Sequence, residues 1–313
     1  MKRIIFIHGR STKPSEDILK MLWVDAVGHG LLKDAGKDAL KIFQDGDIIK
    51  KDFVYYGDLT NQIYIDEGEN VDPVELGKVR KQTLEKLIKR DRRIFLNKSK
   101  FYKHIGVDAK ATFQAAELAD HLARVAGLEK FASEIIEEKM SDMRAYWDKR
   151  SDYSLKVKGK LLSALTDGLN SNDDIMLISH SMGTMVAYDC LWTLCNTQEI
   201  EPGLSGKKVS TWLTLGSPLG ISTVKEKLLG YKDKVYPTNY KQWINVAAKY
   251  DEVAADDDLY NDYEDVLELG VDSIEDEEIY NFATRNGEPN THSSLGYLIH
   301  PKVTRIIQSW MER

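Results

Sequence analysis

Cysteine is scarce in this chain of 313 residues, which excludes the classes of protein that depend on it. Cys190 and Cys195 lie five residues apart on one predicted helix and do not share a helical face, so we expect no disulfide between them. Cysteine and histidine also do not cluster at the spacings of a metal site. The sequence therefore indicates neither a disulfide-rich secreted domain nor a zinc protein, and both cysteines are expected to be core thiols of a cytosolic protein.

Long apolar runs are missing as well. No window approaches the roughly 18 consecutive apolar residues that a membrane span needs. The first apolar stretch, Ile4 to Ile7, is too short for the core of a signal peptide, and Gly9 follows it rather than a cleavage site. We therefore expect a cytoplasmic protein whose first buried strand begins almost at the first residue.

The net charge of −7 conceals two segments of opposite sign. From Lys78 to Lys103 there are eleven basic residues and two acidic ones, whereas from Asp251 to Glu278 there are fourteen acidic residues and no basic one. Such segments are usually solvated surfaces. Alternatively they attract each other, or the basic segment contacts an anionic partner or, peripherally, a membrane surface. The acidic chain as a whole argues against nucleic-acid binding.

Short apolar strands alternate with helical stretches along most of the chain. This pattern predicts an α/β fold with a mostly parallel central sheet and helices on both faces. Helices are expected at residues 16–35, 154–169 and 182–195. Strands are expected at residues 3–7, 51–56, 175–179, 209–215, 243–247 and 278–282.

Residues 58–150 interrupt this alternation. They predict two or more long, charged amphipathic helices, at 73–99 and 108–150. Residues 1–57 and 151–313 would then form the α/β core. The insertion could lie as a helical cap or lid over the carboxyl ends of the strands, where ligands bind in open α/β sheets. The alternative is a helical decoration on the side of the sheet.

A possible nucleophile lies between the strand at 175–179 and the helix that follows it. In Ser179-His180-Ser181-Met182-Gly183, a sharp turn would lift the Ser181 hydroxyl clear of the sheet. The same turn would aim the backbone N–H of Met182 at a developing oxyanion. Such a turn is crowded, and the positions two before and two after the serine hold the small residues that it requires. Ser181 is therefore the candidate nucleophile.

Three other segments could complete a catalytic site. Gly9 would let the backbone pass close to the serine, and the N–H of Arg10 would be a second oxyanion donor. Asp251 is the first acid after the strand at 243–247, where a carboxylate could orient an imidazole. His292 follows the last predicted strand and is the best candidate base. The alternatives are His300 for the base, and for the acid Glu252, Asp256, Asp257 and Asp258.

The order Ser…Asp…His along the chain is that of α/β-hydrolases. The chain resembles α/β-hydrolase-fold serine hydrolases of the lipase and esterase type, in the segments Phe6-Ile7-His8-Gly9, Ser179-His180-Ser181-Met182-Gly183, Thr214-Leu215-Gly216-Ser217-Pro218-Leu219-Gly220, Ala247-Ala248-Lys249-Tyr250-Asp251-Glu252-Val253 and Thr291-His292-Ser293. The resemblance implies Ser181 as nucleophile, His292 as base, Asp251 as acid, and no metal or organic cofactor. Met182 and Arg10 would supply the oxyanion hole. The candidate substrate-binding residues are Gly9, His180, Ser217, Pro218 and Leu219.

The activity implied by this resemblance is hydrolysis of a carboxylic ester, in a lipid or another acyl substrate, through an acyl-enzyme on Ser181. Thioester or amide hydrolysis would use the same residues. An alternative of another class is a hydrolase-fold binding or scaffolding module that acts through the charged cap helices. Two features depart from the family pattern: Ser179 stands where glycine is usual, and the predicted sheet starts without the two antiparallel edge strands that many members have.

Overall fold

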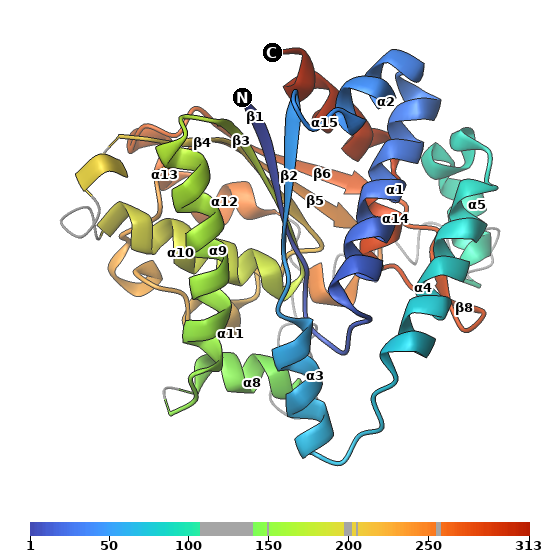
Figure 1. Ribbon diagram of the computed structural model, residues 1–313, viewed down its shortest axis with the longest axis horizontal. Coiled ribbons are helices and arrows are strands. Elements are labelled where there is room, and N and C mark those ends of the chain that lie inside the picture. The colour runs from blue at the N-terminus through green and yellow to red at the C-terminus, as the bar shows by residue number, and fades with distance from the viewer. Residues whose placement is uncertain (107–139, 149, 197–201, 205, 255–257) are drawn as a thin grey trace.

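The computed structural model describes residues 1–106, 140–148, 150–196, 202–204, 206–254 and 258–313. Its centre is a six-stranded sheet in the order β2-β1-β3-β4-β5-β6, in which all neighbouring strands are parallel (Figure 1). The strands are β1 (Lys2–Ile7), β2 (Ile49–Val54), β3 (Asp174–His180), β4 (Val209–Leu215), β5 (Tyr240–Ala248) and β6 (Ser273–Ile279). The predicted α/β class with a parallel central sheet is confirmed.

Helices cover both faces of this sheet (Figure 1). One face carries α1 (Glu16–Asp34), α2 (Lys37–Gln44), α14 (Ser294–Leu298) and α15 (Pro301–Glu312). The other carries α9 (Tyr153–Asn170), α10 (Met182–Asn196) and the short helices α11 (Ser222–Lys225), α12 (Leu259–Tyr263) and α13 (Asp265–Glu268). Successive side chains of β1 alternate between the two cores: Ile4 packs with the first set of helices and Ile5 with the second. Burial on both faces explains the continuous apolar runs of the inner strands.

The last strand of the sheet differs from its predicted position. β6 is Ser273–Ile279, whereas the apolar signal had favoured residues 278–282. The sequence of β6 is SIEDEEI, in which only Ile274 and Ile279 are buried. As an edge strand it is mostly exposed, and such strands commonly carry charge. The apolar residues that follow leave the sheet, and the Tyr280 ring stacks on Phe101 at 5.0 Å.

The described part of the insertion consists of short helical pieces rather than one long helix after residue 73. They are α3 (Gly57–Asp66), α4 (Pro73–Ile88), the 3-10 helix Arg92–Leu96, α5 (Lys98–His104) and α8 (Ser141–Trp147). α4 ends at Ile88, before the predicted end at 99, and a separate turn begins at Asp91, whose carboxylate accepts the Arg93 N–H. Most of the predicted helix at 108–150 lies outside the described residues. α4 and α5 pack with α1 on one core, and α8 packs with α9 on the other.

Some members of the two charged segments form ion pairs with other parts of the protein. Among the described residues, Arg92 of the basic segment pairs with Asp34, while Glu277 of the acidic segment pairs with Lys302. Aromatic contacts join α5 to the residue before Asp251, because the rings of Phe101 and Tyr102 lie 6.3 and 6.0 Å from that of Tyr250. Aromatic packing thus joins the insertion to this end of the sheet, and attraction between the two charged segments stays a prediction.

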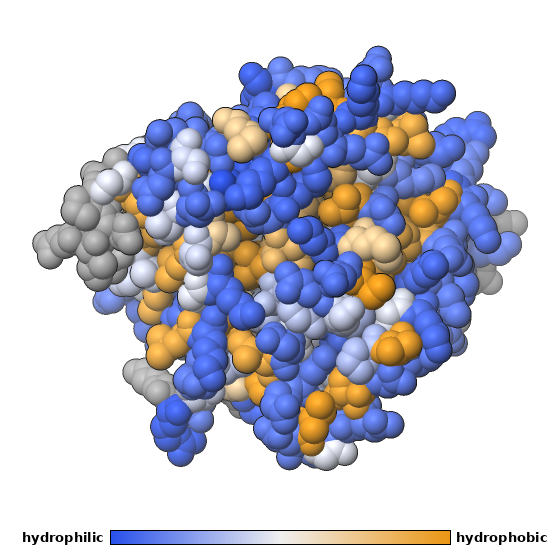
Figure 2. Space-filling model, in the orientation of Figure 1, coloured by the Kyte–Doolittle hydropathy of each residue, from blue (hydrophilic) through white to orange (hydrophobic). Residues whose placement is uncertain are grey.

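The surface in the view of Figure 2 is mostly hydrophilic, with hydrophobic side chains scattered among charged ones. Within the described ranges, no helix combines the length and the apolar character that crossing a membrane would require.

Candidate active site

Ser181 occupies a strained turn between β3 and α10. β3 ends at His180 and α10 begins at Met182, so the turn consists of one residue. Ser181 has a φ of 56°, a left-handed conformation that non-glycine residues adopt at a cost of about 1–3 kcal/mol. Its N–H donates to the Leu215 carbonyl at 3.0 Å, which ties the turn to β4. This is the local geometry that the sequence predicted for the candidate nucleophile.

The chain passes so close to this turn that side chains are excluded at two positions. A Cβ at Gly9 would lie 2.4 Å from the Ser181 Cβ, and a Cβ at Gly183 would lie 2.5 Å from the His8 carbonyl oxygen. The serine at position 179 fits because its hydroxyl turns toward β4, where it accepts the Trp212 indole N–H at 3.0 Å. The departure from glycine at this position is therefore accommodated without an unpaired buried hydroxyl.

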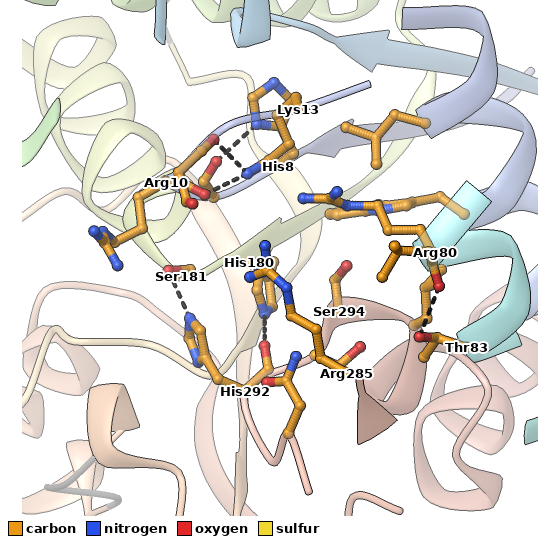
Figure 3. Close-up of a pocket in the computed structure, with 18 residues that line it drawn as sticks. His8, Arg10, Lys13, Arg80, Thr83, His180, Ser181, Arg285, His292 and Ser294 are labelled. Atoms are coloured by element: carbon orange, nitrogen blue, oxygen red, sulfur yellow. Dashed lines mark hydrogen bonds between the residues drawn. The ribbon is translucent and has the colours of Figure 1, made fainter. Parts of the chain in front are cut away.

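Three side chains from separate segments form one hydrogen-bonded chain. His292 Nε2 lies 2.8 Å from Ser181 Oγ, and His292 Nδ1 lies 2.9 and 2.8 Å from the two carboxylate oxygens of Asp251 (Figure 3 shows the first of these contacts). A carboxylate only accepts, so Nδ1 carries the proton and donates it, which leaves Nε2 as the acceptor for the serine hydroxyl. The structure thus brings together the three residues that the sequence analysis selected.

Asp251 is fully buried, yet it is held in its charged form. Burial alone would raise the pKa of its carboxyl group. The His292 ring and hydrogen bonds from Tyr297 and the Val253 N–H outweigh burial, and the pKa lies below its ordinary value. The Tyr297 hydroxyl donates to Asp251 Oδ2 at 2.6 Å and accepts the Ala248 N–H at 2.7 Å. A charged carboxylate here can stabilise an imidazolium on His292.

Tyr297 and Asn281 support the site, and the sequence analysis missed both. The Asn281 side-chain amide donates to the carbonyls of Thr291 and Ser293 at 2.8 and 2.9 Å, so it clamps the loop on either side of His292. Tyr297 lies five residues after His292, on the helix that the histidine loop opens. Their roles depend on contacts between distant parts of the chain, and no local motif indicates them.

The loop after β1 carries the second candidate oxyanion donor and is held by the insertion. Asp142 of α8 accepts the Ser11 N–H at 2.5 Å and the Arg10 Nε at 3.4 Å. Asn61 of α3 accepts the Lys13 N–H at 2.7 Å and donates back to its carbonyl at 2.9 Å. Within the described ranges, the backbone N–H groups of Arg10 and Met182 have no hydrogen-bond acceptor. Buried N–H groups are normally paired with an acceptor. These two donors are therefore available to the oxygen of a bound ligand.

A cavity of about 180 Å³ opens beside Ser181 (Figure 3). Of the predicted substrate-binding residues, Gly9 and His180 line it, together with Arg10 and His292. Three others are not among the described lining residues, because the chain after β4 turns into the core. The Ser217 hydroxyl donates to Thr184 Oγ1 at 3.0 Å, and Pro218 and Leu219 are buried. The prediction of a pocket edge at Ser217, Pro218 and Leu219 is therefore not supported by their positions.

The two other histidines beside the site, His8 and His180, are neutral and hold neighbouring groups by hydrogen bonds. His8 Nδ1 donates to the Gly9 carbonyl at 2.8 Å while its Nε2 accepts the Tyr56 N–H at 3.0 Å. His180 Nε2 donates to the His292 carbonyl at 3.0 Å, and its ring lies 4.7 Å from the His292 ring. Burial lowers the pKa of both His8 and His180. They therefore position the turn and the base while adding no charge to the cavity.

His300, the alternative base, performs a structural role. It is buried at the start of α15, where Nδ1 accepts the Lys302 N–H at 3.1 Å and Nε2 donates to the Phe95 carbonyl at 3.1 Å. Both ring nitrogens are occupied, so the ring has no lone pair for a serine hydroxyl. The geometry favours His292 over His300.

Acid should destabilise the protein through His300. Burial lowers its pKa to about 3, so below the ordinary value near ~6.5 the unfolded chain binds a proton that the folded protein does not. The free energy of unfolding should then fall by up to about 1.4 kcal/mol per pH unit from this residue as the pH drops from about 6.5 toward 3. Urea unfolding of the wild type and of His300→Gln, each at pH 7 and pH 5, measures this slope. An equal pH dependence in both proteins would contradict the assignment.

Replacing Gly9 with alanine should strongly lower kcat without unfolding the protein. The added Cβ overlaps the Ser181 Cβ at 2.4 Å, so either the serine or the loop that carries the Arg10 N–H must shift. Loss of one oxyanion donor typically lowers kcat by about 10²–10³-fold, and we expect a loss of that size. Gly159→Ala is the matched control, because a Cβ there meets nothing within 4 Å. Retention of full activity by Gly9→Ala would show that the close approach is unimportant.

Among the described residues, no group of three or more histidine, cysteine, aspartate or glutamate side chains could hold a metal ion. The described lining of the cavity instead combines basic side chains with Ser181 and His292. In comparisons with known proteins, no family model, no curated protein and no solved structure matches this chain.

Proposed function

We propose that this protein is a serine hydrolase that cleaves a carboxylic ester through an acyl-enzyme on Ser181. The observation that carries the proposal is the continuous chain of hydrogen bonds from Ser181 Oγ through His292 to Asp251. A serine hydroxyl is a weak nucleophile until an adjacent base accepts its proton. Here a base oriented by a buried carboxylate lies within 2.8 Å of that hydroxyl.

The proposed reaction proceeds in two halves. In the first, Ser181 Oγ attacks the ester carbonyl carbon while His292 Nε2 takes the hydroxyl proton, and the oxyanion accepts hydrogen bonds from the N–H groups of Met182 and Arg10. His292 then returns the proton to the leaving alkoxide. In the second half, His292 takes a proton from a water molecule whose oxygen attacks the acyl carbon. The bond between that carbon and Ser181 Oγ then breaks and His292 returns the proton to Oγ, so that ester and water have become acid and alcohol and the free enzyme is restored.

The architecture supports an α/β-hydrolase core for this chemistry. The nucleophile, acid and base follow β3, β5 and β6 in the chain order Ser…Asp…His, at the carboxyl ends of parallel strands. In the described ranges all neighbouring strands of the central sheet are parallel. Val79, Arg80 and Thr83 of α4 line the cavity, which supports a capping role for this part of the insertion.

The size of the cavity favours a small acyl substrate over a long-chain lipid. Pockets for drug-sized ligands commonly enclose about 300–1,000 Å³. The cavity at Ser181 encloses about 180 Å³, and the apolar side chains among its described lining residues are Leu19, Trp23, Val79 and Leu295. Among simple esters we therefore propose a preference for short acyl groups.

Trapping of the acyl-enzyme tests the proposal directly. With p-nitrophenyl acetate, butyrate and octanoate, we expect a burst of one nitrophenolate per protein and a falling kcat/KM as the chain lengthens. A fluorophosphonate should modify the protein once, with the adduct mapped to Ser181. Thioester and amide substrates of the same acyl group identify the bond that is cleaved fastest. A folded protein that resists labelling would leave the hydrolase-fold binding module as the better explanation.

A further inference from the structure

The cavity beside Ser181 is strongly cationic. Its described lining contains four basic side chains and no acidic one: Arg10, Lys13, Arg80 and Arg285. They come from three separate parts of the chain, which are the loop after β1, helix α4 and the hairpin of β7 (Thr284–Arg285) with β8 (Glu288–Pro289). An ester pocket for neutral substrates has no need of this concentration of charge, because like charges in a small space repel one another.

Two of these cations already interact with other groups of the protein. The Arg10 guanidinium lies against the carboxylate of Asp142 and points away from the cavity in Figure 3. The Lys13 ammonium group donates to the carbonyl oxygens of Arg10 and Ser11, and so serves to hold the loop. Burial, and then the neighbouring Arg80, lower the pKa of Lys13. The two cations left to meet a ligand are Arg80 and Arg285.

Arg80 is held in place by carbonyl groups rather than by an acid. It donates to the Leu76 carbonyl at 3.1 Å and, through the other terminal nitrogen, to the Thr12 carbonyl at 2.8 Å. These bonds fix the guanidinium but do not neutralise its charge. Burial, and then the charge of Arg285, lower its pKa to about 10, so it remains protonated at neutral pH. A guanidinium in this state gains much from an added anion.

Arg285 is brought to the same cavity by a contact between α4 and the hairpin. The Thr83 hydroxyl on α4 donates to the Thr284 carbonyl at 2.8 Å, which places the next residue beside Arg80. Figure 3 shows Arg80 and Arg285 pointing toward the middle of the cavity from two sides. Arg285 is exposed and makes no ion pair within the described part of the chain. Two convergent guanidinium groups form a site for a carboxylate or phosphate.

We propose that the substrate of this site is a small ester that carries an anionic group, a carboxylate or a phosphate, bound by Arg80 and Arg285 beside Ser181. This inference rests on the proposed function. The bound anion offsets the repulsion between the two guanidinium groups, which gives the ligand a favourable interaction that a neutral ester lacks. Fixing one end of a small substrate in this way also orients its carbonyl toward Ser181.

Matched pairs of esters test this inference in the full-length protein. Monomethyl succinate against methyl butyrate places the charge on the acyl side. 4-Carboxyphenyl acetate and 4-phosphonooxyphenyl acetate, each against phenyl acetate, place a carboxylate or a phosphate on the leaving-group side. We expect kcat/KM for at least one anionic ester to exceed that of its neutral match by about tenfold or more, since charge-assisted hydrogen bonds are the stronger kind.

Variants then identify the residues responsible. Arg285→Gln, a change at an exposed position, should lower the ratio of anionic to neutral kcat/KM by about 10- to 100-fold, and Arg80→Met should act in the same direction. Lys81→Gln is the control, since it removes the same charge from an exposed position of α4 outside the cavity lining, and its ratio should stay at the wild-type value.

The outcomes separate this inference from the proposed function. If the wild type hydrolyses every ester pair equally, or if neither arginine variant lowers the ratio, the anion site is wrong while the serine hydrolase stands. If the wild type hydrolyses no ester and takes up no fluorophosphonate, the proposed function itself fails.

Discussion

Replacing Ser181 with alanine should abolish ester hydrolysis and fluorophosphonate labelling while leaving the protein folded. The substitution removes the hydroxyl that lies 2.8 Å from His292 Nε2 and leaves the rest of the hydrogen-bonded chain intact. Members of such a triad act as a unit, and loss of the nucleophile lowers kcat by about 10⁶-fold in a well-studied case. We expect a loss of that order in steady-state assays, with unchanged circular dichroism.

Ser217→Ala is the matched control for this experiment. Ser217 is also buried near the start of α10, but its hydroxyl donates to Thr184 Oγ1 and its side chain does not belong to the described lining of the cavity. The Ser217→Ala protein should still be labelled. Labelling of Ser181→Ala on Ser179 or Ser217 would show that the nucleophile has been misassigned.

Replacing Asp251 with asparagine should lower kcat by about 10⁴-fold, as loss of the buried acid does in a triad of this kind. Asparagine keeps the shape of the side chain, but its amide NH₂ would face His292 Nδ1 and favour the tautomer with the proton on Nε2. That tautomer has no lone pair for the Ser181 proton. The neutral amide would also stabilise an imidazolium less than the buried carboxylate does. Single-turnover kinetics with p-nitrophenyl acetate measures this loss at the acylation step.

Asp258→Asn is the corresponding control among the acids that the sequence left open. The Asp258 carboxylate caps α12 by accepting the Asn261 N–H at 3.3 Å. Its replacement should leave kcat within about threefold of the wild type, because surface changes of this kind are usually small. Asp256 and Asp257 lie outside the described residues. Full activity in Asp251→Asn together with inactivity in a variant of either would mean that the acid is one of them.

The sequence predicted the parts of the protein that depend on local patterns. The apolar run before Ser181 and the small residues around it indicate a strand and a crowded turn, and both are present. The places of Ser181, Asp251 and His292 after predicted strands, together with their order along the chain, selected three residues that the fold brings within hydrogen-bonding distance. Such local patterns can be recognised in the sequence because each segment must satisfy its own backbone and burial requirements.

Features that depend on distant contacts were missed. Asp142 and Ser11 are joined by a hydrogen bond across 131 positions of the chain, and no motif relates them. The acidic edge strand β6 lacks the apolar signal that identified the inner strands, so its position was misjudged. The convergence of Arg80 and Arg285 depends on the packing of α4 against the β7–β8 hairpin, which the charge pattern alone does not reveal.

The bonds from Asn61 and Asp142 to the loop after β1 bear on how the protein can be divided into modules. The insertion could be removed by cutting the chain after residue 57 and before residue 151, where the alternation of strands and helices is interrupted. This deletion would also remove Asn61 and Asp142, the side chains that hold the loop that carries Arg10. The insertion cannot then be exchanged as an independent accessory. In engineering terms, a minimal version of this protein must retain α3 and α8, and also α4 between them, because Arg80 and Thr83 of α4 line the cavity.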